Sequence, residues 1–175
     1  MILKTITYGI ALGSNLGDRL ANLQRALKAV LELKANVTLI TAAPIYETEP
    51  VDCPEGSQSF YNTVVEVAAL LEPLSMLSEL RGIEARLGRS NDHFRHEPRT
   101  VDLDILYAGD VLMNHPDLIV PHPRMTQRRF VMEPLAAIRP GLLLPGQTAD
   151  VQTLLARLES GERALVKVSE VWCAA

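Results

Sequence analysis

The sequence predicts an α+β fold, and three observations predict it. An alternating apolar pattern over residues 5–12 is followed by leucines spaced three and four apart up to residue 31, which indicates a strand and then an amphipathic helix. The same order of strand and helix returns over residues 61–88. No helical pattern lies between residues 37 and 69, which excludes a purely parallel sheet because parallel neighbours need crossover helices. We therefore expect a ferredoxin-like β-α-β-β-α-β core with a mainly antiparallel sheet, flanking helices and a C-terminal extension.

The first strand and helix are predicted from residues 5–31. The turn GSNLGD separates them; we expect Ser14 and Asn15 to cap this turn and Asp18 to favour the positive N-terminal end of the helix. Asn36 breaks the helical pattern. The strand places Ile6, Tyr8, Ile10 and Leu12 on one face, and the apolar face of the helix comprises Leu16, Leu20, Leu23, Leu27, Val30 and Leu31.

Two further strands and a second helix follow. We expect strands at residues 37–43 and 61–69, joined by the long polar loop PIYETEPVDCPEGSQS, since connections of this length are commonly functional loops. The second helix begins at Glu72-Pro73, because proline is tolerated in the first helical turn, and Gly88 suits its C-terminal end. Its predicted buried face comprises Leu74, Leu77, Leu80, Ile83 and Leu87.

The remaining chain begins with another strand, TVDLDILY, which directs Val101, Leu103 and Ile105 to the core. After a turn at Gly109-Asp110, the residues VLM are expected to return as its short hairpin partner. A segment rich in proline and arginine then leads into an apolar stretch at 131–138. We expect a terminal helix at 152–158 and a last strand or tail at 164–172.

Length and composition limit the classes of protein. The 175 residues suit one domain, residues 1–175, and a net charge of −4 argues against a nucleic-acid or membrane-surface binder. Two cysteines, no apolar run long enough to span a bilayer and no signal-peptide pattern favour a cytoplasmic protein. We expect small-molecule substrates and no obligate protein partner.

Asp102 and Asp104 are the most informative pair of residues. Side chains at i and i+2 of a strand point to the same side, with Cα atoms roughly 7 Å apart. Two neighbouring carboxylates repel each other unless a cation lies between them, and Mg²⁺ is the usual partner, completed by waters and phosphates. The alternative is an exposed face of an edge strand, since short motifs often match by chance.

Basic side chains near this pair favour the metal interpretation. Arg89 and Arg95 lie in the preceding loop and Arg99 is three residues before Asp102. Arginines beside carboxylate-bound Mg²⁺ are typical of phosphoryl-group transfer. His122, between two prolines and close to Arg128, is a candidate phosphate contact or a bystander. The turn GSNLG lacks the lysine and spacing of a phosphate loop, so we interpret it as a tight strand-to-helix turn.

A flat ring could be bound by Phe60, Phe130 and Asn62. Two aromatic rings stack on a heterocycle, and the Asn62 amide both donates and accepts hydrogen bonds. The alternative is that both phenylalanines belong to the core.

Five stretches of the sequence, in order, resemble the 6-hydroxymethyl-7,8-dihydropterin pyrophosphokinase family of folate biosynthesis. They are ALGSNLGDR, YETEPV, FYNTVV, RHEPRTVDLDIL and VPHPRMTQRRFVMEPL, and they cover about residues 7 to 145. The resemblance implies a ferredoxin-like core and transfer of the terminal diphosphate of ATP to the pterin hydroxymethyl group, with release of AMP.

The resemblance also implies roles for individual residues. Asp102 and Asp104 would bind two Mg²⁺ ions, and Arg89 and Arg99 would act on the transferring group. The remaining implied contacts are Glu84 and the Ile105 backbone to adenosine, His122 and Arg128 to the triphosphate, Phe60 and Phe130 to the faces of the pterin, and Asn62 with the backbone around Thr48 and Val51 to its edge.

Two other functions remain open at this point. A metal-dependent phosphohydrolase would use the same two aspartates but would release phosphate without a pterin. A non-enzymatic ferredoxin-like module would bind a ligand or RNA, although the acidic net charge and the absence of an aromatic RNA-binding strand argue against RNA.

Overall fold

The computed structural model describes residues 4–49, 58–88, 100–159 and 165–173. Its main sheet has six strands within these ranges, in the order β5-β1-β4-β3-β8, with β2 also pairing with β4. The elements are β1 (Ile6–Ser14), α1 (Arg19–Leu31), β2 (Thr38–Ala42), β3 (Ile45–Thr48), β4 (Phe60–Ala69), α2 (Pro73–Arg86), β5 (Asp102–Ala108), β6 (Met113–His115), β7 (Leu118–Val120), the 3₁₀ turn Met125–Gln127, α3 (Arg129–Ile138), α4 (Val151–Ala156) and β8 (Val166–Ser169).

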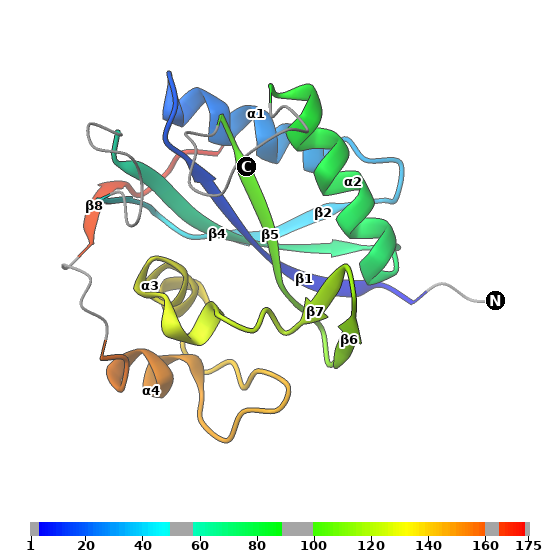
Figure 1. Cartoon of the computed structure of the whole chain (residues 1–175), viewed down its shortest axis with the longest axis vertical. Helices are drawn as coiled ribbons and strands as arrows, with labels where there is room; N and C mark the ends of the chain where they lie inside the picture. Colours follow the sequence, from blue (N-terminus) through cyan, green and yellow to red (C-terminus); the bar gives the residue numbers. More distant parts are fainter. Residues whose placement is uncertain (1–3, 50–57, 89–99, 160–164, 174–175) are drawn as a thin grey trace.

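Two β-α-β units interleave in this sheet. β4 lies between β1 and β2, and β1 lies between β4 and β5, with every pairing antiparallel. Crossovers between strands of one sheet share one hand, which puts α1 and α2 on the same face. Figure 1 shows these two helices on one side of the sheet and α3 and α4 on the other. The predicted ferredoxin-like α+β core with an antiparallel sheet is confirmed.

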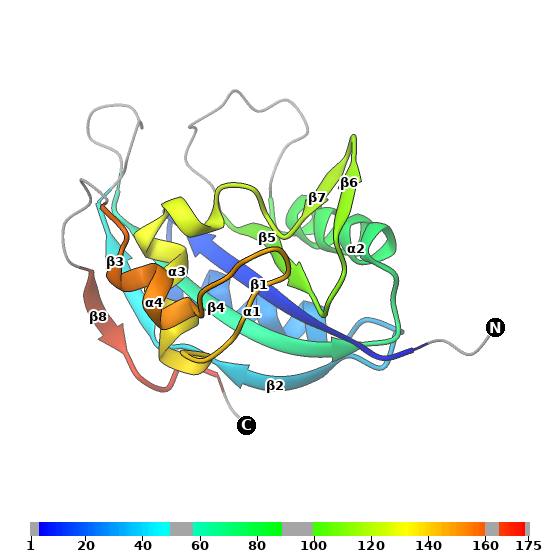
Figure 2. The same ribbon diagram turned by 90° about the horizontal axis from the view of Figure 1, so that it is seen from below.

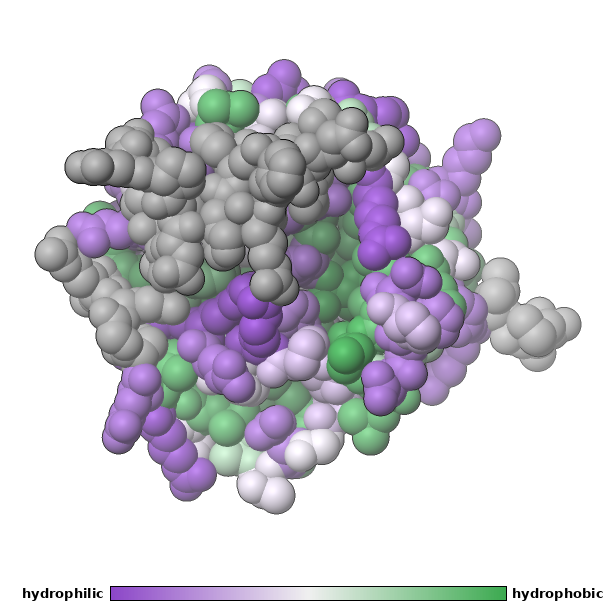
Figure 3. Space-filling view, viewed as in Figure 1, coloured by the Kyte–Doolittle hydropathy of each residue, from purple (hydrophilic) through white to green (hydrophobic). Residues whose placement is uncertain are grey.

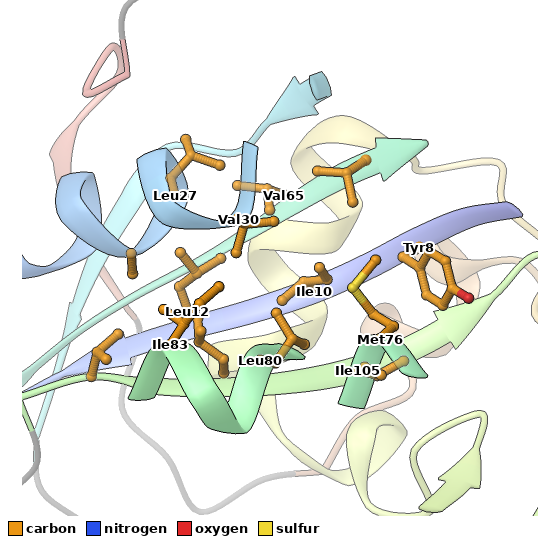
Figure 4. Packing of buried hydrophobic residues seen from close by; sticks show 14 of the residues in the cluster. Tyr8, Ile10, Leu12, Leu27, Val30, Val65, Met76, Leu80, Ile83 and Ile105 are labelled. Atoms are coloured by element: carbon orange, nitrogen blue, oxygen red, sulfur yellow. The ribbon is translucent and has the colours of Figure 1, made fainter. Parts of the chain in front are cut away.

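The core under α1 and α2 confirms the alternation predicted for the first strand. Tyr8, Ile10 and Leu12 of β1 are almost fully buried, as is Ile105 of β5. They pack against side chains of both helices, including Leu27 and Val30 of α1 and Met76, Leu80 and Ile83 of α2 (Figure 4).

A second core lies on the opposite face of the sheet. Val131, Met132 and Leu135 of α3 pack there against Val64 of β4 and Leu106 of β5. Figure 2, seen from below, places α3 and α4 in front of the sheet. On β4 the contact lies at Val64, in the middle of the strand, whereas β1 continues as far as Ser14.

The first helix begins later than its leucine spacing predicts. Ser14 still belongs to β1, so the expectation that it caps the turn is wrong. α1 begins at Arg19, and Asp18 is its N-cap, since the Asp18 carboxylate accepts a hydrogen bond from the Ala21 N–H at 3.0 Å. Leu16 and Leu20 are consequently exposed instead of buried.

The predicted long loop contains a strand that the polar composition hides. Residues Ile45–Thr48 form β3, which pairs with β4 and also with β8. Glu47 in this strand is satisfied by partners on the α1 face, so an acidic residue occurs inside a strand.

The residues VLM do not return to β5 as predicted. Met113–His115 pair instead with Leu118–Val120 in a separate two-stranded sheet. α2 begins at Pro73 and buries Leu80 and Ile83 as predicted, but Met76 is buried and Leu74 is exposed.

Candidate active site

A row of three residues crosses the centre of the sheet near the C-terminal end of β1. Gly13 pairs with Asn62 of β4 on one side and with Asp102 of β5 on the other. Directly opposed residues of neighbouring strands project to the same face of a sheet. The row therefore places Asn62 and Asp102 on the face that carries α3, on either side of a residue with no side chain.

The missing side chain of Gly13 leaves space between the two predicted halves of the site. A Cβ at this position would lie 2.9 Å from Asn62 Oδ1 and 4.0 Å from both Asp102 Cβ and Phe60 Cδ1. The first distance is shorter than a real Cβ contact, so glycine is required for the observed position of the Asn62 amide. Three residues predicted separately, Phe60, Asn62 and Asp102, thus surround one position.

Thr48 joins this group through a hydrogen bond. The Asn62 Nδ2 group donates to Thr48 Oγ1 at 2.8 Å, and Thr48 pairs with Phe60 across β3 and β4. Asn62 is buried, whereas Phe60 and Thr48 are half-buried. The hydrogen bond fixes the amide so that its orientation toward a ligand is set before binding.

Asp102 and Asp104 lie on the same face of β5, and both are half-buried. Asp104 pairs with Ala11, which is two residues from Gly13 along β1 and on the same face. Within the part of the chain that the structure describes, no group of three or more His, Cys, Asp or Glu residues is placed to hold a metal ion. Carboxylate oxygens are ligands that suit Mg²⁺, which completes its shell with waters and phosphate oxygens.

His122 is fixed by backbone contacts at the outer side of β5. Its N–H donates to the Leu106 carbonyl at 2.8 Å, and its Nδ1 accepts from the Arg124 N–H at 3.2 Å. Burial lowers the pKa of His122 below its usual value of 6.5, and the charges of Arg128 and Arg124 lower it further. The imidazole is therefore neutral at pH 7, and the bond to Nδ1 assigns its proton to Nε2.

Arg128 and Phe130 lie at the beginning of α3. The Arg128 guanidinium carbon lies 5.4 Å from the centroid of the Phe130 ring, within the range of a cation–π contact. Phe130 is half-buried and packs against the α3 core, as does Ala11 of β1. Phe130 and Ala11 therefore belong to the sheet face that carries Asp104.

Glu84 and Ile105 occupy a different position from the other predicted residues. The Ile105 side chain is buried under α2, so only its backbone can contact a ligand. Glu84 of α2 is also buried, and its Oε1 accepts from the Leu103 N–H at 2.8 Å. This N–H points away from β1, and Ile105, two residues later, directs its N–H to the same outer edge of β5.

Three of the predicted site residues lie outside the described residues: Val51, Arg89 and Arg99. Their roles stay predictions. The Thr100 carbonyl, at the border of the described residues, accepts a hydrogen bond from the Ser14 hydroxyl at 2.7 Å.

Sequence reasoning missed two polar clusters that hold the strand ends of the site. In the first, the buried Asn22 amide of α1 donates to Ser14 Oγ and to the Leu16 carbonyl, so that α1, β1 and the approach to β5 are joined. The signal in the sequence is the polar pair Ser14-Asn15 directly after the apolar strand, and the structure buries both residues. In the second, Arg19 contacts Glu47 and Ser59 on the α1 face.

One hollow adjoins Arg19 on the α1 face, away from Asp102 and Asp104. It has a volume of about 410 Å³ and is lined mainly by the first turn of α1, by Tyr61 and by β8. A smaller hollow of about 170 Å³ adjoins His122 and Met125. The candidate site is defined by its side chains, because neither of these hollows is lined by Asp102 or Asp104. In Figure 3 a group of hydrophilic side chains lies near the centre of the face shown.

Comparison with known proteins assigns the chain to a family. The sequence profile of 7,8-dihydro-6-hydroxymethylpterin-pyrophosphokinase matches residues 9–140, and the chain belongs to this family. It is 45% identical over 136 residues to the 2-amino-4-hydroxy-6-hydroxymethyldihydropteridine pyrophosphokinase of Bacillus subtilis, covering 78% of this chain and 79% of that protein. It is 41% identical over 136 residues to the enzyme of the same name from Pseudomonas aeruginosa, covering 78% and 82%.

Other relatives are longer than this chain. A folate synthesis bifunctional protein of Arabidopsis thaliana is 38% identical over 136 residues, which cover 76% of this chain and 28% of that protein. The crystal structure of Plasmodium falciparum HPPK-DHPS with pterin and p-hydroxybenzoate has a similar fold, with a TM-score of 0.67 and 17% identity. The match covers 88% of this chain but less than half, 42%, of that one.

Proposed function

We propose that the chain is an ATP- and Mg²⁺-dependent diphosphotransferase of tetrahydrofolate biosynthesis. It transfers the β,γ-diphosphate of ATP to the hydroxymethyl group of 6-hydroxymethyl-7,8-dihydropterin and releases AMP. The relatives from B. subtilis and P. aeruginosa carry the corresponding name. The observation that carries the proposal is the row of Asn62, Gly13 and Asp102. It puts the Asn62 amide, the proposed contact to the pterin edge, on the same sheet face as the carboxylate pair.

The reaction needs two ligands held side by side. The hydroxymethyl oxygen attacks the β-phosphorus, the bond from that phosphorus to the oxygen bridging the α- and β-phosphates breaks, and AMP leaves with this oxygen. The hydroxyl proton is released to solvent. Positioning and charge stabilisation supply most of the catalysis in such transfers. Gly13, whose missing side chain leaves room for the Asn62 amide, lies between the groups proposed to bind the two substrates.

Asp102 and Asp104 are proposed to hold two Mg²⁺ ions. Their shared face, half-burial and all-oxygen chemistry support this role. When bound, the ions neutralise the phosphate oxygens and align the triphosphate. The protein contributes a rigid strand, since β5 is paired along its length with β1.

His122 and Arg128 are proposed to contact the triphosphate, together with Arg89 and Arg99. A neutral His122 donates one hydrogen bond from Nε2, which suits a phosphate oxygen, and the nearby Arg128 adds charge. The outer edge of β5, with Glu84 and the Ile105 backbone, is proposed to bind the adenosine.

The pterin is proposed to lie between Phe60 and Phe130. Asn62, fixed by Thr48, reads its edge together with backbone groups near Thr48 and Val51. Stacking contributes on the order of 1 kcal/mol per ring pair beyond burial. A buried amide that loses its partner costs about 1–3 kcal/mol, so Asn62 favours ligands with a complementary hydrogen-bonding edge.

The proposal takes residues 1–175 as a single cytoplasmic domain that acts on two small molecules, without nucleic acid, membrane or an obligate protein partner. Among the described residues, no helix is both long and apolar enough to cross a membrane.

Product analysis tests the proposed function. We expect the protein, incubated with ATP, Mg²⁺ and 6-hydroxymethyl-7,8-dihydropterin, to release one AMP for each pterin diphosphate formed, and to release none when the pterin is omitted. Phosphate release without the pterin would overturn the proposal in favour of a phosphohydrolase. A protein that binds both ligands but forms neither product would also overturn it.

A further inference from the structure

The cluster around Arg19 joins three segments on the face opposite the candidate site. Arg19 Nη1 donates to Glu47 Oε1 at 2.8 Å, to the Ser59 carbonyl at 2.8 Å and to Ser59 Oγ at 2.6 Å. The Ser59 hydroxyl in turn donates to Glu47 Oε1. The Arg19 guanidinium carbon also lies 3.8 Å from the centroid of the Tyr61 ring. One guanidinium therefore connects the start of α1 to the ends of β3 and β4.

These residues alternate with the proposed pterin contacts along the same two strands. Glu47 pairs with Tyr61, and the next pair along is Thr48 with Phe60. Successive side chains of a strand point to opposite faces. The Arg19 contacts thus hold β3 and β4 together from the α1 face, while the Asn62–Thr48 hydrogen bond joins the same strands from the other face.

The short length of β3 leaves few backbone pairs to fix its register, three with β4 and three with β8. β3 has four residues, and three of them are paired with β4. A slip of one residue would turn Thr48 to the opposite face. Arg19 and Glu47 are 20% and 35% exposed, so solvent weakens their charge interaction. Hydrogen bonds from Ser59 and Arg19 nevertheless lower the pKa of Glu47, which indicates that its charged form is the one held.

We infer that Arg19 and Glu47 are positioning residues for the pterin: with Ser59 they fix the register of β3 and β4 and so hold Thr48 where it orients Asn62. The inference rests on the proposed function and adds residues outside the binding face to it. Both side chains lie on the sheet face opposite the proposed pterin contacts.

Steady-state kinetics of Arg19→Met and Glu47→Ala test the inference. We expect each change to raise the KM for the pterin roughly tenfold, which corresponds to about 1.4 kcal/mol. The KM for ATP and kcat should stay within about twofold of wild type, because β5 and its aspartates are untouched. Glu47→Gln keeps an oxygen acceptor for Arg19 and Ser59 and should recover most of the pterin affinity.

Two control variants remove charges from the other end of α1. Lys28 and Glu32 form an exposed pair with 3.8 Å between Nζ and Oε1, so Lys28→Met and Glu32→Ala should leave both KM values unchanged. Thermal unfolding of every variant measures any loss of overall stability. A variant that only loosens the fold would have a lower Tm and would also show a raised KM for ATP or a lowered kcat.

A double-mutant cycle separates positioning from a direct role. If Glu47 acts through Asn62, Glu47→Ala should raise the pterin Kd by much less in an Asn62→Ala background than in wild type. Additive losses, or equal losses for ATP and the pterin, would overturn the inference. If the wild-type protein releases AMP and Glu47→Ala has an unchanged KM for the pterin, only this inference is overturned. If the wild-type protein releases no AMP, both the proposed function and this inference are overturned.

Discussion

Gly13 and Asn62 are opposite each other in β1 and β4, and the Asn62 amide oxygen occupies the space that a side chain at position 13 would need. A Cβ there would lie 2.9 Å from Asn62 Oδ1. The same glycine pairs with Asp102 on its other side. The missing side chain at position 13 therefore leaves room for the Asn62 amide between the proposed pterin and phosphate contacts.

Gly13→Ala is expected to weaken pterin binding selectively. The added methyl displaces the Asn62 amide from the orientation set by Thr48, and we expect a loss of about 1–2 kcal/mol, or roughly tenfold in Kd. Calorimetric titration with each ligand measures this loss, and ATP binding should stay unchanged. Gly141→Ala is the matched control, because a Cβ at position 141 meets nothing within 4 Å. Equal losses for both ligands would contradict the interpretation.

Asp102→Asn and Asp104→Asn should each abolish most of the activity without unfolding the protein. The amides keep the shape of the carboxylates but lose the charge that binds the metal, and we expect kcat/KM to fall about 10³-fold. Initial rates of AMP release at saturating Mg²⁺ measure this, with Asp110→Asn in the exposed turn after β5 as the control. If either variant keeps near wild-type turnover, that residue is not a metal ligand.

His122→Gln should reduce the acid sensitivity of folding. Burial, followed by Arg128 and Arg124, lowers the pKa of His122 in the folded protein, so the unfolded chain binds this proton more readily. The resulting stability is present above the unfolded value of about 6.5 and is lost as the pH falls through the lower folded value. Urea unfolding at pH 7.5 and 5.5 should show a smaller difference for His122→Gln than for wild type. His115→Gln, on the β6–β7 hairpin, is the control; an unchanged difference in His122→Gln would refute the assignment.

Arg139→Met should destabilise the fold at a distance from the proposed site. Glu66 is 4% exposed on its side chain, and Arg139 and the Tyr107 hydroxyl both donate to it. Without Arg139 the buried carboxylate loses its counter-charge, and we expect the free energy of unfolding to fall by about 2–3 kcal/mol, because Arg139 is itself partly exposed. Chemical unfolding checks this against Arg157→Met in the exposed C-terminal end of α4. Equal stability of the two variants would show that the Glu66 contact contributes nothing.

The sequence predicted the helices and strands that have a strong apolar period. The prediction failed where polar side chains form hydrogen bonds with one another. Tyr8, Ile10 and Leu12 are buried as their alternation requires. β3 was hidden because Glu47 and Thr48 are polar, and their partners, Arg19 and Asn62, are distant in sequence. The hairpin partner of residues 111–113 was predicted to be the strand just before them in sequence. Met113 pairs instead with Val120, which follows the next turn.

The candidate site shows the same division. The spacing of Asp102 and Asp104 predicted that they share one face of a strand, and both lie on one face of β5. Their closeness to Asn62 depends on the register of β1 with both β4 and β5, which no local pattern encodes. The role of Gly13 follows only from that register.

Paramagnetic relaxation tests most directly that one site joins the carboxylate pair to Asn62. Mn²⁺ in place of Mg²⁺, added with a non-hydrolysable ATP analogue, should broaden the side-chain amide signals of Asn62, since Asp102 is two strand spacings, or roughly 10 Å, away. Asn36, at the opposite end of the sheet, should keep sharp signals, and the Asp102→Asn/Asp104→Asn double variant should lose the broadening at Asn62. Sharp Asn62 signals in the wild-type protein with Mn²⁺ bound would contradict the account.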